Sequence, residues 1–238
     1  GATLSNNTTG SYNTALGFQA LKTNTTASNN TAVGYQAGYS NTTGNAQTFI
    51  GYKAGLNVTT GNRNTYIGYQ AGLSSGTAEG NTAIGVSAGQ TLSTGSNNTL
   101  VGGRSDTGTN EGSGLSLTTG SYNNFFGGNS GSSVTTGSKN TILGNYNGNQ
   151  GGLDIRTASN YIVLSDGDGN PRMVVNSTGA RTYAQSSGQL NVLEGYAEWN
   201  NVSSTTFNLT TIFPVGTISG AGLTLQLMCI SQSNTSNA

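Results

Sequence analysis

The sequence contains no histidine, and this absence excludes several kinds of active site at once. Without an imidazole the chain can form neither a Ser-His-Asp triad, nor a Cys-His pair, nor a histidine-ligated metal centre. Cys229 is the only cysteine, so no intrachain disulfide can form. Its apolar neighbours, 225–230, indicate a small buried hydrophobic residue rather than a reactive thiol.

Charge and long hydrophobic runs are also scarce. Charged residues make up 7% of the chain, the net charge is zero, and Lys and Arg do not cluster, so we expect no nucleic-acid partner. No run of about 18 apolar residues occurs, so we expect no membrane insertion. Only 32% of residues are hydrophobic, against roughly 45–50% in ordinary domains. Two prolines and zero net charge nevertheless argue against disorder. We expect order that comes from backbone hydrogen bonds, repeated ladders and subunit association.

What the sequence does have is an internal repeat, which is the first feature to seek in such a chain. Glycine recurs at every seventeenth position and resumes at Gly127 and Gly144 after one longer interval, so eight additional residues lie inside 103–114. Eight cycles cover residues 1–150. The regular glycines are Gly17, Gly34, Gly51, Gly68, Gly85 and Gly102.

Other residue types keep fixed places in the same cycle. Thr stands at 9, 26, 43, 60, 77, 94, 119 and 136. Asn stands at Asn13, Asn30, Asn64, Asn81, Asn98, Asn123 and Asn140, with Gln47 as the one substitute. A large apolar column follows at Leu16, Val33, Ile50, Ile67, Ile84, Val101, Phe126 and Leu143. Beyond it come a mainly aromatic column, Phe18, Tyr35, Tyr52, Tyr69 and Val86, and an alanine column, Ala20, Ala37, Ala54, Ala71 and Ala88.

This pattern predicts an all-β parallel solenoid, a β-roll or β-helix, with one 17-residue coil per cycle. The apolar, aromatic and alanine columns fall at every second position, which is a strand period and predicts that all three face the interior. Each cycle has room for two short strands and two turns, and it is too short for a βαβ unit. Stacked Asn and Thr can form hydrogen-bond ladders, and stacked rings can pack on one another.

The apolar content of each cycle also predicts association. About three apolar side chains per coil form a narrow stripe, which encloses little core within one chain. Three chains around a common axis would bury a second stripe and cover exposed edges. We therefore expect a homotrimer.

Two phrases, 13–21 and 30–38, resemble repeats of phage tail-fibre proteins and are similar, more distantly, to the heads of trimeric autotransporter adhesins. The resemblance implies a trimeric β-roll that supports host attachment on a virion, outside the cell. It implies other fibre or virion proteins and a host-surface glycan or protein receptor as partners. The 17-residue period departs from the adhesin period. Residues 159–179 resemble a segment that often follows such repeats in phage fibres, where a cleaved intramolecular chaperone comes later.

The period fades after residue 150. Residues 151–182 predict a β-hairpin connector whose turn contains Asp166, Asp168 and Asn170. These three have the spacing of oxygen ligands in a calcium loop, but the later Glu of such loops is missing, so a plain turn is the favoured interpretation. Residues 183–238 alternate again and predict a small antiparallel β domain, either a tip or a connector.

Candidates for chemistry are few. Glu194 and Glu198, with Asp154 or Asp166, could form a glycosidase pair, yet nothing in the sequence places them across a cleft. The aromatic column could bind sugar, but its parity favours interior or inter-subunit packing. Tyr196 and Trp199 are the better candidates for ligand contact. We therefore expect a non-enzymatic fibre without cofactor or metal; the alternatives are a bacterial trimeric adhesin head and, less favoured, a polysaccharide depolymerase fibre.

Overall fold

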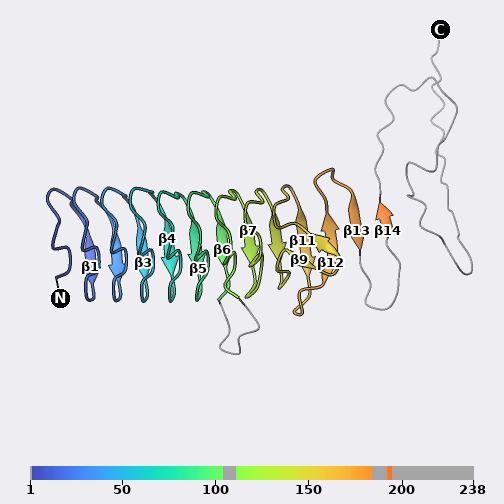
Figure 1. Ribbon diagram of the computed structural model, residues 1–238, viewed down its shortest axis with the longest axis horizontal. Helices are drawn as coiled ribbons and strands as arrows, with labels where there is room; N and C mark the ends of the chain where they lie inside the picture. The colour runs from blue at the N-terminus through green and yellow to red at the C-terminus, as the bar shows by residue number, and fades with distance from the viewer. Residues whose placement is uncertain (1, 104–110, 184–191, 195–238) are drawn as a thin grey trace, which may run out of the picture. The chain divides into compact units, whose positions relative to one another are not determined.

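The computed structural model describes residues 2–103, 111–183 and 192–194. These residues contain strands and turns and no helix, and they form the predicted parallel β-solenoid (Figure 1). The coils lie one above the next, and each contributes one strand to a common sheet of 12 strands. The expected fold class, all-β with stacked 17-residue coils, is confirmed.

Each coil has one short strand, not the two strands that the sequence pattern suggested. The remainder of the coil runs through turns whose backbone N–H groups donate to carbonyl oxygens of neighbouring coils, as Leu21 does to Ala37, or within the same coil, as Asn24 does to Leu21. The strands of the stack are β1 (Thr14–Leu16), β2 (Thr31–Val33), β3 (Thr48–Ile50), β4 (Thr65–Ile67), β5 (Thr82–Ile84), β6 (Thr99–Val101), β7 (Asn124–Phe126) and β8 (Thr141–Leu143).

Successive strands pair in parallel with equivalent residues opposite each other. Thr14 pairs with Thr31, and Ala15 pairs with Ala32, so the offset is one complete cycle of the repeat. Between β6 and β7 the offset also includes the additional residues of the longer coil, because Thr99 pairs with Asn124. The register of the columns is therefore the same on both sides of the longer coil.

The middle residue of each of these strands faces the interior, and its size is matched by the residues around it. Phe49 is fully buried, and a Cβ built on Gly38 would lie 2.5 Å from its ring. Next to the small Ala32, by contrast, the equivalent of Gly38 in the preceding coil is the buried Leu21. Large and small residues thus alternate across the narrow core, as close packing requires. The buried middle residues are Ala32, Phe49, Tyr66, Ala83, Leu100, Phe125 and Ile142, and Val163 continues the column in the next strand.

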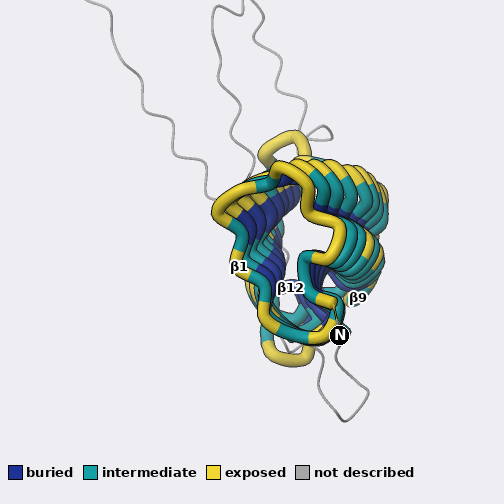
Figure 2. Tube along the Cα trace, turned by 90° about the vertical axis from the view of Figure 1, so that its left-hand side faces the viewer, coloured by how far each residue is buried: buried dark blue, intermediate teal, exposed yellow. Residues whose placement is uncertain are grey.

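The orientation of the two most conspicuous columns was predicted wrongly. The alanine column is buried as expected, but the apolar column of Leu16 and the aromatic column of Phe18 point outward. In so short a strand the first and last residues share the outer face, which assigns Leu16 to the outside. Gly17 and the left-handed Gln19 then turn the chain, so strict alternation does not continue from the strand to Ala20. Figure 2 shows the buried positions repeating along the inner wall of the stack.

After the last regular coil the sheet becomes antiparallel. β9 (Asn149–Gln150) and β10 (Leu153–Asp154) form a small separate hairpin. β11 (Ile162–Ser165) pairs in parallel with β8 and then antiparallel with β12 (Pro171–Val175). The order continues through β13 (Arg181–Tyr183) and β14 (Val192–Glu194). The rest of the predicted domain at 183–238 lies outside the described residues.

Candidate interaction surface

A column of glycines forms the sharpest corner of the coil. Gly68 has φ +133°, a backbone conformation that L side chains rarely adopt, and its equivalents in the other coils are similar. A Cβ on Gly68 would also lie 2.5 Å from the carbonyl oxygen of Gly85 in the next coil. Only glycine allows the coils to approach this closely, which accounts for the strict glycine spacing.

The asparagine column forms a buried ladder along the stack. The Asn81 Oδ1 accepts a hydrogen bond of 2.9 Å from the backbone N–H of Asn98, and the same bond recurs from Asn13 to Tyr161. Gln47 takes the asparagine role in its coil, with its side-chain oxygen 2.9 Å from the N–H of Asn64. The Asn81 Nδ2 donates to the carbonyl oxygen of Gly95 at 2.9 Å. Such a side chain therefore satisfies an N–H and a carbonyl group of the next coil in the interior, although the Asn30 Nδ2 has no partner.

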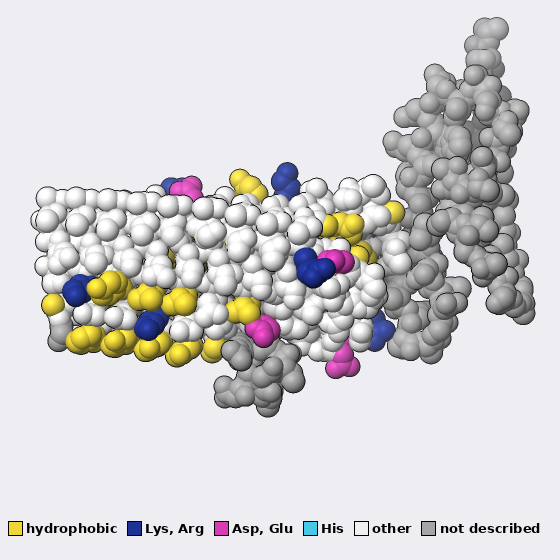
Figure 3. Space-filling view, viewed as in Figure 1, with side chains coloured by type: hydrophobic (Ala, Val, Ile, Leu, Met, Phe, Trp, Pro, Cys, Tyr) yellow, Lys and Arg dark blue, Asp and Glu magenta, His cyan; other side chains and the backbone are white. Residues whose placement is uncertain are grey.

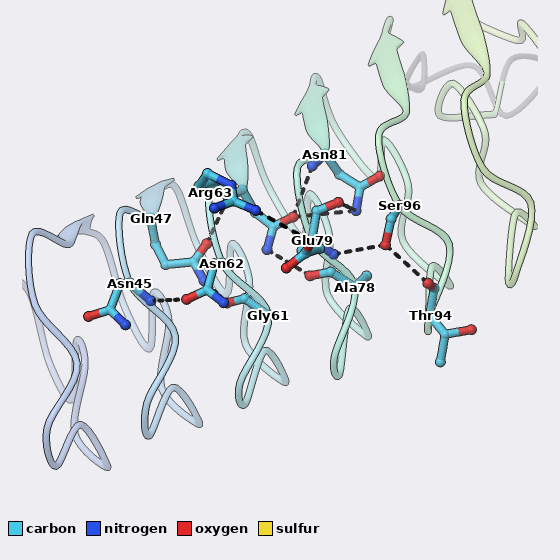
Figure 4. Close-up of polar contacts among 11 residues, drawn as sticks. Asn45, Gln47, Gly61, Asn62, Arg63, Ala78, Glu79, Asn81, Thr94 and Ser96 are labelled. Carbon is cyan, nitrogen blue, oxygen red and sulfur yellow. Dashed lines mark hydrogen bonds and ion pairs between the residues drawn. The ribbon is translucent and has the colours of Figure 1, made fainter.

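A second ladder lies on an outer edge and has the opposite polarity. Here the side chain accepts from the coil before it: Asn45 N–H donates to the Asn62 Oδ1 at 2.8 Å, and Glu79 N–H to the Ser96 Oγ at 3.2 Å. Glu79 itself extends toward Arg63, whose Nη2 lies 3.4 Å from the carboxylate (Figure 4). Both side chains of this ion pair are exposed to solvent, so the pair contributes little to stability.

Threonine occupies two adjacent columns with different environments. Thr25, Thr42 and Thr59 donate their hydroxyls to the carbonyl oxygen of the next coil at 3.0–3.1 Å. The unvarying column that begins with Thr9 and Thr26 is exposed in every described coil. The ladder is thus made by the more variable of the two columns.

Two rows of apolar side chains run along the outside of the stack, on either side of the glycine corner. The aliphatic row is the column from Leu16 to Leu143, and the aromatic row is the column from Phe18 to Val86. Leu16 is 67% exposed and Tyr69 is 49% exposed. In Figure 3 a row of yellow side chains runs along the lower edge of the stack over the first coils. Apolar side chains that recur in rows on the outside, rather than singly, make this face a candidate interaction surface, although Val33, Ile67 and Val101 are half-buried.

The rings of the aromatic row stack on one another. The ring centroids of Phe18, Tyr35, Tyr52 and Tyr69 are 5.4, 5.3 and 4.9 Å apart, and the planes of successive rings differ by 6–10°. The expectation of interior packing for this column is wrong, since all four rings are exposed. A sugar that stacks on a ring needs a free face, and here neighbouring rings cover the faces along the row. Contact with a partner chain remains a prediction.

The Asp166 loop is held by internal bonds. The Asp166 Oδ1 accepts the N–H groups of Asp168 and Asn170 at 3.1 and 2.8 Å, while its Oδ2 accepts the Arg172 Nε at 2.9 Å. The N–H of Asn170 and the Arg172 side chain lower the pKa of the Asp166 carboxyl below its ordinary value. The described residues contain no group of three or more carboxylate, thiol or imidazole side chains that could hold a metal ion.

The other candidates for chemistry are scattered or lie elsewhere. Asp154 forms an exposed ion pair with Arg156, with 2.7 Å between Oδ2 and Nη2, and hydrogen bonds from that side chain lower its pKa to about 2. A carboxyl held ionised in this way is unsuited to act as the acid of a glycosidase. Glu194 lies in β14, and its side chain is outside the described residues. Tyr196, Glu198 and Trp199 are likewise outside them.

These features define the class of the protein: a parallel β-solenoid with buried asparagine ladders and two exposed apolar rows. No family model, curated protein or solved structure matches the chain. Residues 2–103, 111–183 and 192–194 contain no helix long and apolar enough to cross a membrane.

Proposed function

We propose that the chain is a structural segment of a trimeric attachment fibre of the phage-tail type. In this role it holds a receptor-binding part away from the particle and transmits attachment to the host surface. Its partners are two further copies of itself, other virion proteins, and a glycan or protein receptor on the host. It performs no catalysis.

The single observation that carries this proposal is the pair of exposed apolar rows. A monomeric protein gains nothing from keeping Leu16, Tyr35 and Ile50 in water, because each exposed apolar side chain forgoes burial energy. Association around a common axis would cover both rows along several consecutive coils. The resemblance of the repeats to phage tail-fibre proteins agrees with this arrangement.

The mechanical demands of a fibre suit the stacked coils. Each coil is bonded to the next through the sheet, the asparagine ladder and the threonine hydroxyls. Such one-dimensional structures are stabilised by nearest-neighbour contacts, so stability is distributed along the whole stack. These bonds between coils make the stack stiff without any disulfide. Such stability suits a protein that is exposed outside a cell.

The proposal is tested by the mass and shape of the purified full chain. Light scattering after size exclusion should give three times the mass of one chain, and negative-stain electron microscopy should show rods. A mass of one chain would overturn the fibre proposal. Incubation with host surface polysaccharide should leave the polysaccharide length unchanged, and the release of shortened chains would overturn the non-enzymatic assignment.

A further inference from the structure

The aliphatic and aromatic rows face two different directions from one corner. Ile50 and Tyr52 both point outward, and Gly51 between them, with φ +133°, turns the chain. The same arrangement recurs in the first five coils, from Leu16 and Phe18 to Ile84 and Val86. One chain therefore presents two apolar strips that cannot cover each other.

The axial repeat of the rows restricts what can cover them. Neither row contains a charged residue; a nearby charge is the Lys53 Nζ, 5.2 Å from the ring centroid of Tyr52. The side chains recur once per coil, at the spacing of adjacent strands, about 4.8 Å. A partner that contacts every coil must repeat with the same spacing along the axis. A second copy of this chain meets this condition over the full stack, if it lies parallel and in register.

Side-chain sizes in the two rows are complementary at one level of the stack. The aromatic row ends at Val86, and its equivalents in the next three coils are Gly103, Gly128 and Asn145. At the level of Gly128 the aliphatic row carries its one aromatic residue, Phe126, which is 40% exposed. At this level a large side chain in one row accompanies a missing side chain in the other, whereas the smaller Val101 stands at the level of Gly103. This compensation is expected of rows that contact each other, as in packed cores.

We infer that the aliphatic row of each copy packs against the aromatic row of the next copy, with all copies parallel and in register. The inference rests on the proposed trimer and identifies its interface. Two different strips that meet in this way form a head-to-tail contact, which closes into a ring when the rotation fits. Three copies close the ring with the glycine corners toward the common axis.

Other pairings fit less well. An antiparallel pair would place the tyrosines of one chain beside the glycine levels of the other. A contact of the aromatic row with itself would leave the aliphatic rows in water. The head-to-tail pairing covers both rows and also places Phe126 beside Gly128 of a neighbouring copy.

Disulfide trapping tests the pairing in the full chain with Cys229 replaced by serine. Chains carrying Ile50→Cys are co-expressed with differently tagged chains carrying Tyr52→Cys, so that a bond between the two reports contact between copies. Disulfides form only where Cβ atoms come within about 3.5–4.5 Å. The matched controls are Ile50→Cys with Val86→Cys, two coils away, and Ile50→Cys with Thr60→Cys, in an exposed column elsewhere on the coil.

The expected result is a cross-linked species containing both tags for the Ile50→Cys and Tyr52→Cys pair and its loss in both controls and in each variant alone. Cross-linking within one variant alone, or equally through Val86→Cys, would overturn the pairing or its register. Light scattering distinguishes a failure of the pairing from a failure of the proposed trimer. A trimer that gives no mixed cross-link refutes the pairing and leaves the proposed fibre intact, whereas a monomer refutes both.

Discussion

The side-chain oxygen of Asn81 accepts two hydrogen bonds from Asn98, one coil further along the stack: 2.9 Å from the backbone N–H and 3.0 Å from the side-chain Nδ2. Both residues are buried, so no water can replace these bonds. The stack is therefore stabilised from within by side chains that act as additional backbone partners.

Asn81→Ala should destabilise the protein by about 1–3 kcal/mol for each buried group left without a partner. The groups affected are the N–H of Asn98 and the carbonyl oxygen of Gly95. Urea denaturation followed by circular dichroism measures the change. Thr94→Ala, at an exposed position of the same stack, is the control and should stay within about 0.5 kcal/mol. Equal effects of the two substitutions would refute the ladder's role.

Gly68→Ala should prevent normal stacking of the fourth coil on the fifth. The new methyl group would meet the carbonyl oxygen of Gly85 at 2.5 Å, and the backbone at φ +133° would be strained as well. Overpacking and backbone strain together cost on the order of 3 kcal/mol or more. Gly167→Ala is the control, since nothing lies within 4 Å of a Cβ there. Melting temperatures of the two variants should differ clearly, and matched values would contradict the close-approach explanation.

Phe49→Ala and Ile50→Thr should separate folding from association. Phe49 is fully buried, and its truncation should cost about 3–5 kcal/mol of folding stability. Ile50 points outward, and threonine keeps the β-branched shape, so the fold of the chain should persist. Light scattering should then show weaker association for Ile50→Thr at low protein concentration. A larger loss of folding stability for Ile50→Thr than for Phe49→Ala would show that the assigned orientations are reversed.

Tyr66→Phe should leave stability at neutral pH unchanged or higher, because the buried Tyr66 hydroxyl has no hydrogen-bond partner. Burial raises the pKa of Tyr66 far above its ordinary value of 10.0. The unfolded chain then releases this proton at lower pH than the folded one, so stability falls as pH rises above about 10. Tyr66→Phe should reduce this alkaline loss.

Tyr146→Phe is the matched comparison for that experiment. Burial, followed by the charge of Asp154, also raises the pKa of Tyr146, but its hydroxyl donates to the carbonyl oxygen of Leu153 at 2.8 Å. This variant should lose about 1 kcal/mol at neutral pH. Denaturation at pH 7 and pH 11 measures both effects, and a stability cost for Tyr66→Phe as large as that for Tyr146→Phe would contradict the difference.

Asp166→Ala should loosen the β11–β12 hairpin, since it removes the acceptor of the Asn170 N–H and the Arg172 side chain. Because the pKa of Asp166 is lowered in the folded protein, its contribution is present above the unfolded pKa near 3.8 and is lost as pH falls through the lower folded value. Hydrogen exchange of the hairpin amides at pH 6 and pH 3 measures this. Calcium or a chelator should change neither profile, and protection by calcium would establish the loop as a metal site.

Much of the fold can be predicted from the sequence because every coil needs the same residue type at the same position. The spacing of Gly17 and its equivalents follows from close contact between coils, and that of Asn13 and its equivalents from the ladder, so both columns stand out without any structure. The orientation of the strand, by contrast, cannot be read from the columns. The inward position holds Ala32 in one coil and Phe49 in the next, so it looks variable, while the constant outward Ile50 and Ile67 look like core.

A signal for the correct orientation was present in covariation within the repeat. Leu21 accompanies Ala32, and Gly38 accompanies Phe49, as expected of neighbours that share a fixed volume. The left-handed residues of the turns, such as Gln36 and Lys53, gave no comparable signal, because neither residue type favours positive φ. The sequence therefore does not reveal where the turns interrupt the alternation of inward and outward side chains.

The register across β6 and β7 has a consequence for how such a chain can change in length. The additional residues leave Thr99 opposite Asn124 and the asparagine ladder unbroken, with the Asn98 Oδ1 2.9 Å from the N–H of Asn123. Extra residues within one coil therefore leave the register of the flanking strands unchanged, and removal of a complete repeat would join two equivalent cross-sections. Reach along the axis is set in whole-coil steps, so gene duplication or deletion of a single repeat would lengthen or shorten the molecule without redesign of its neighbours.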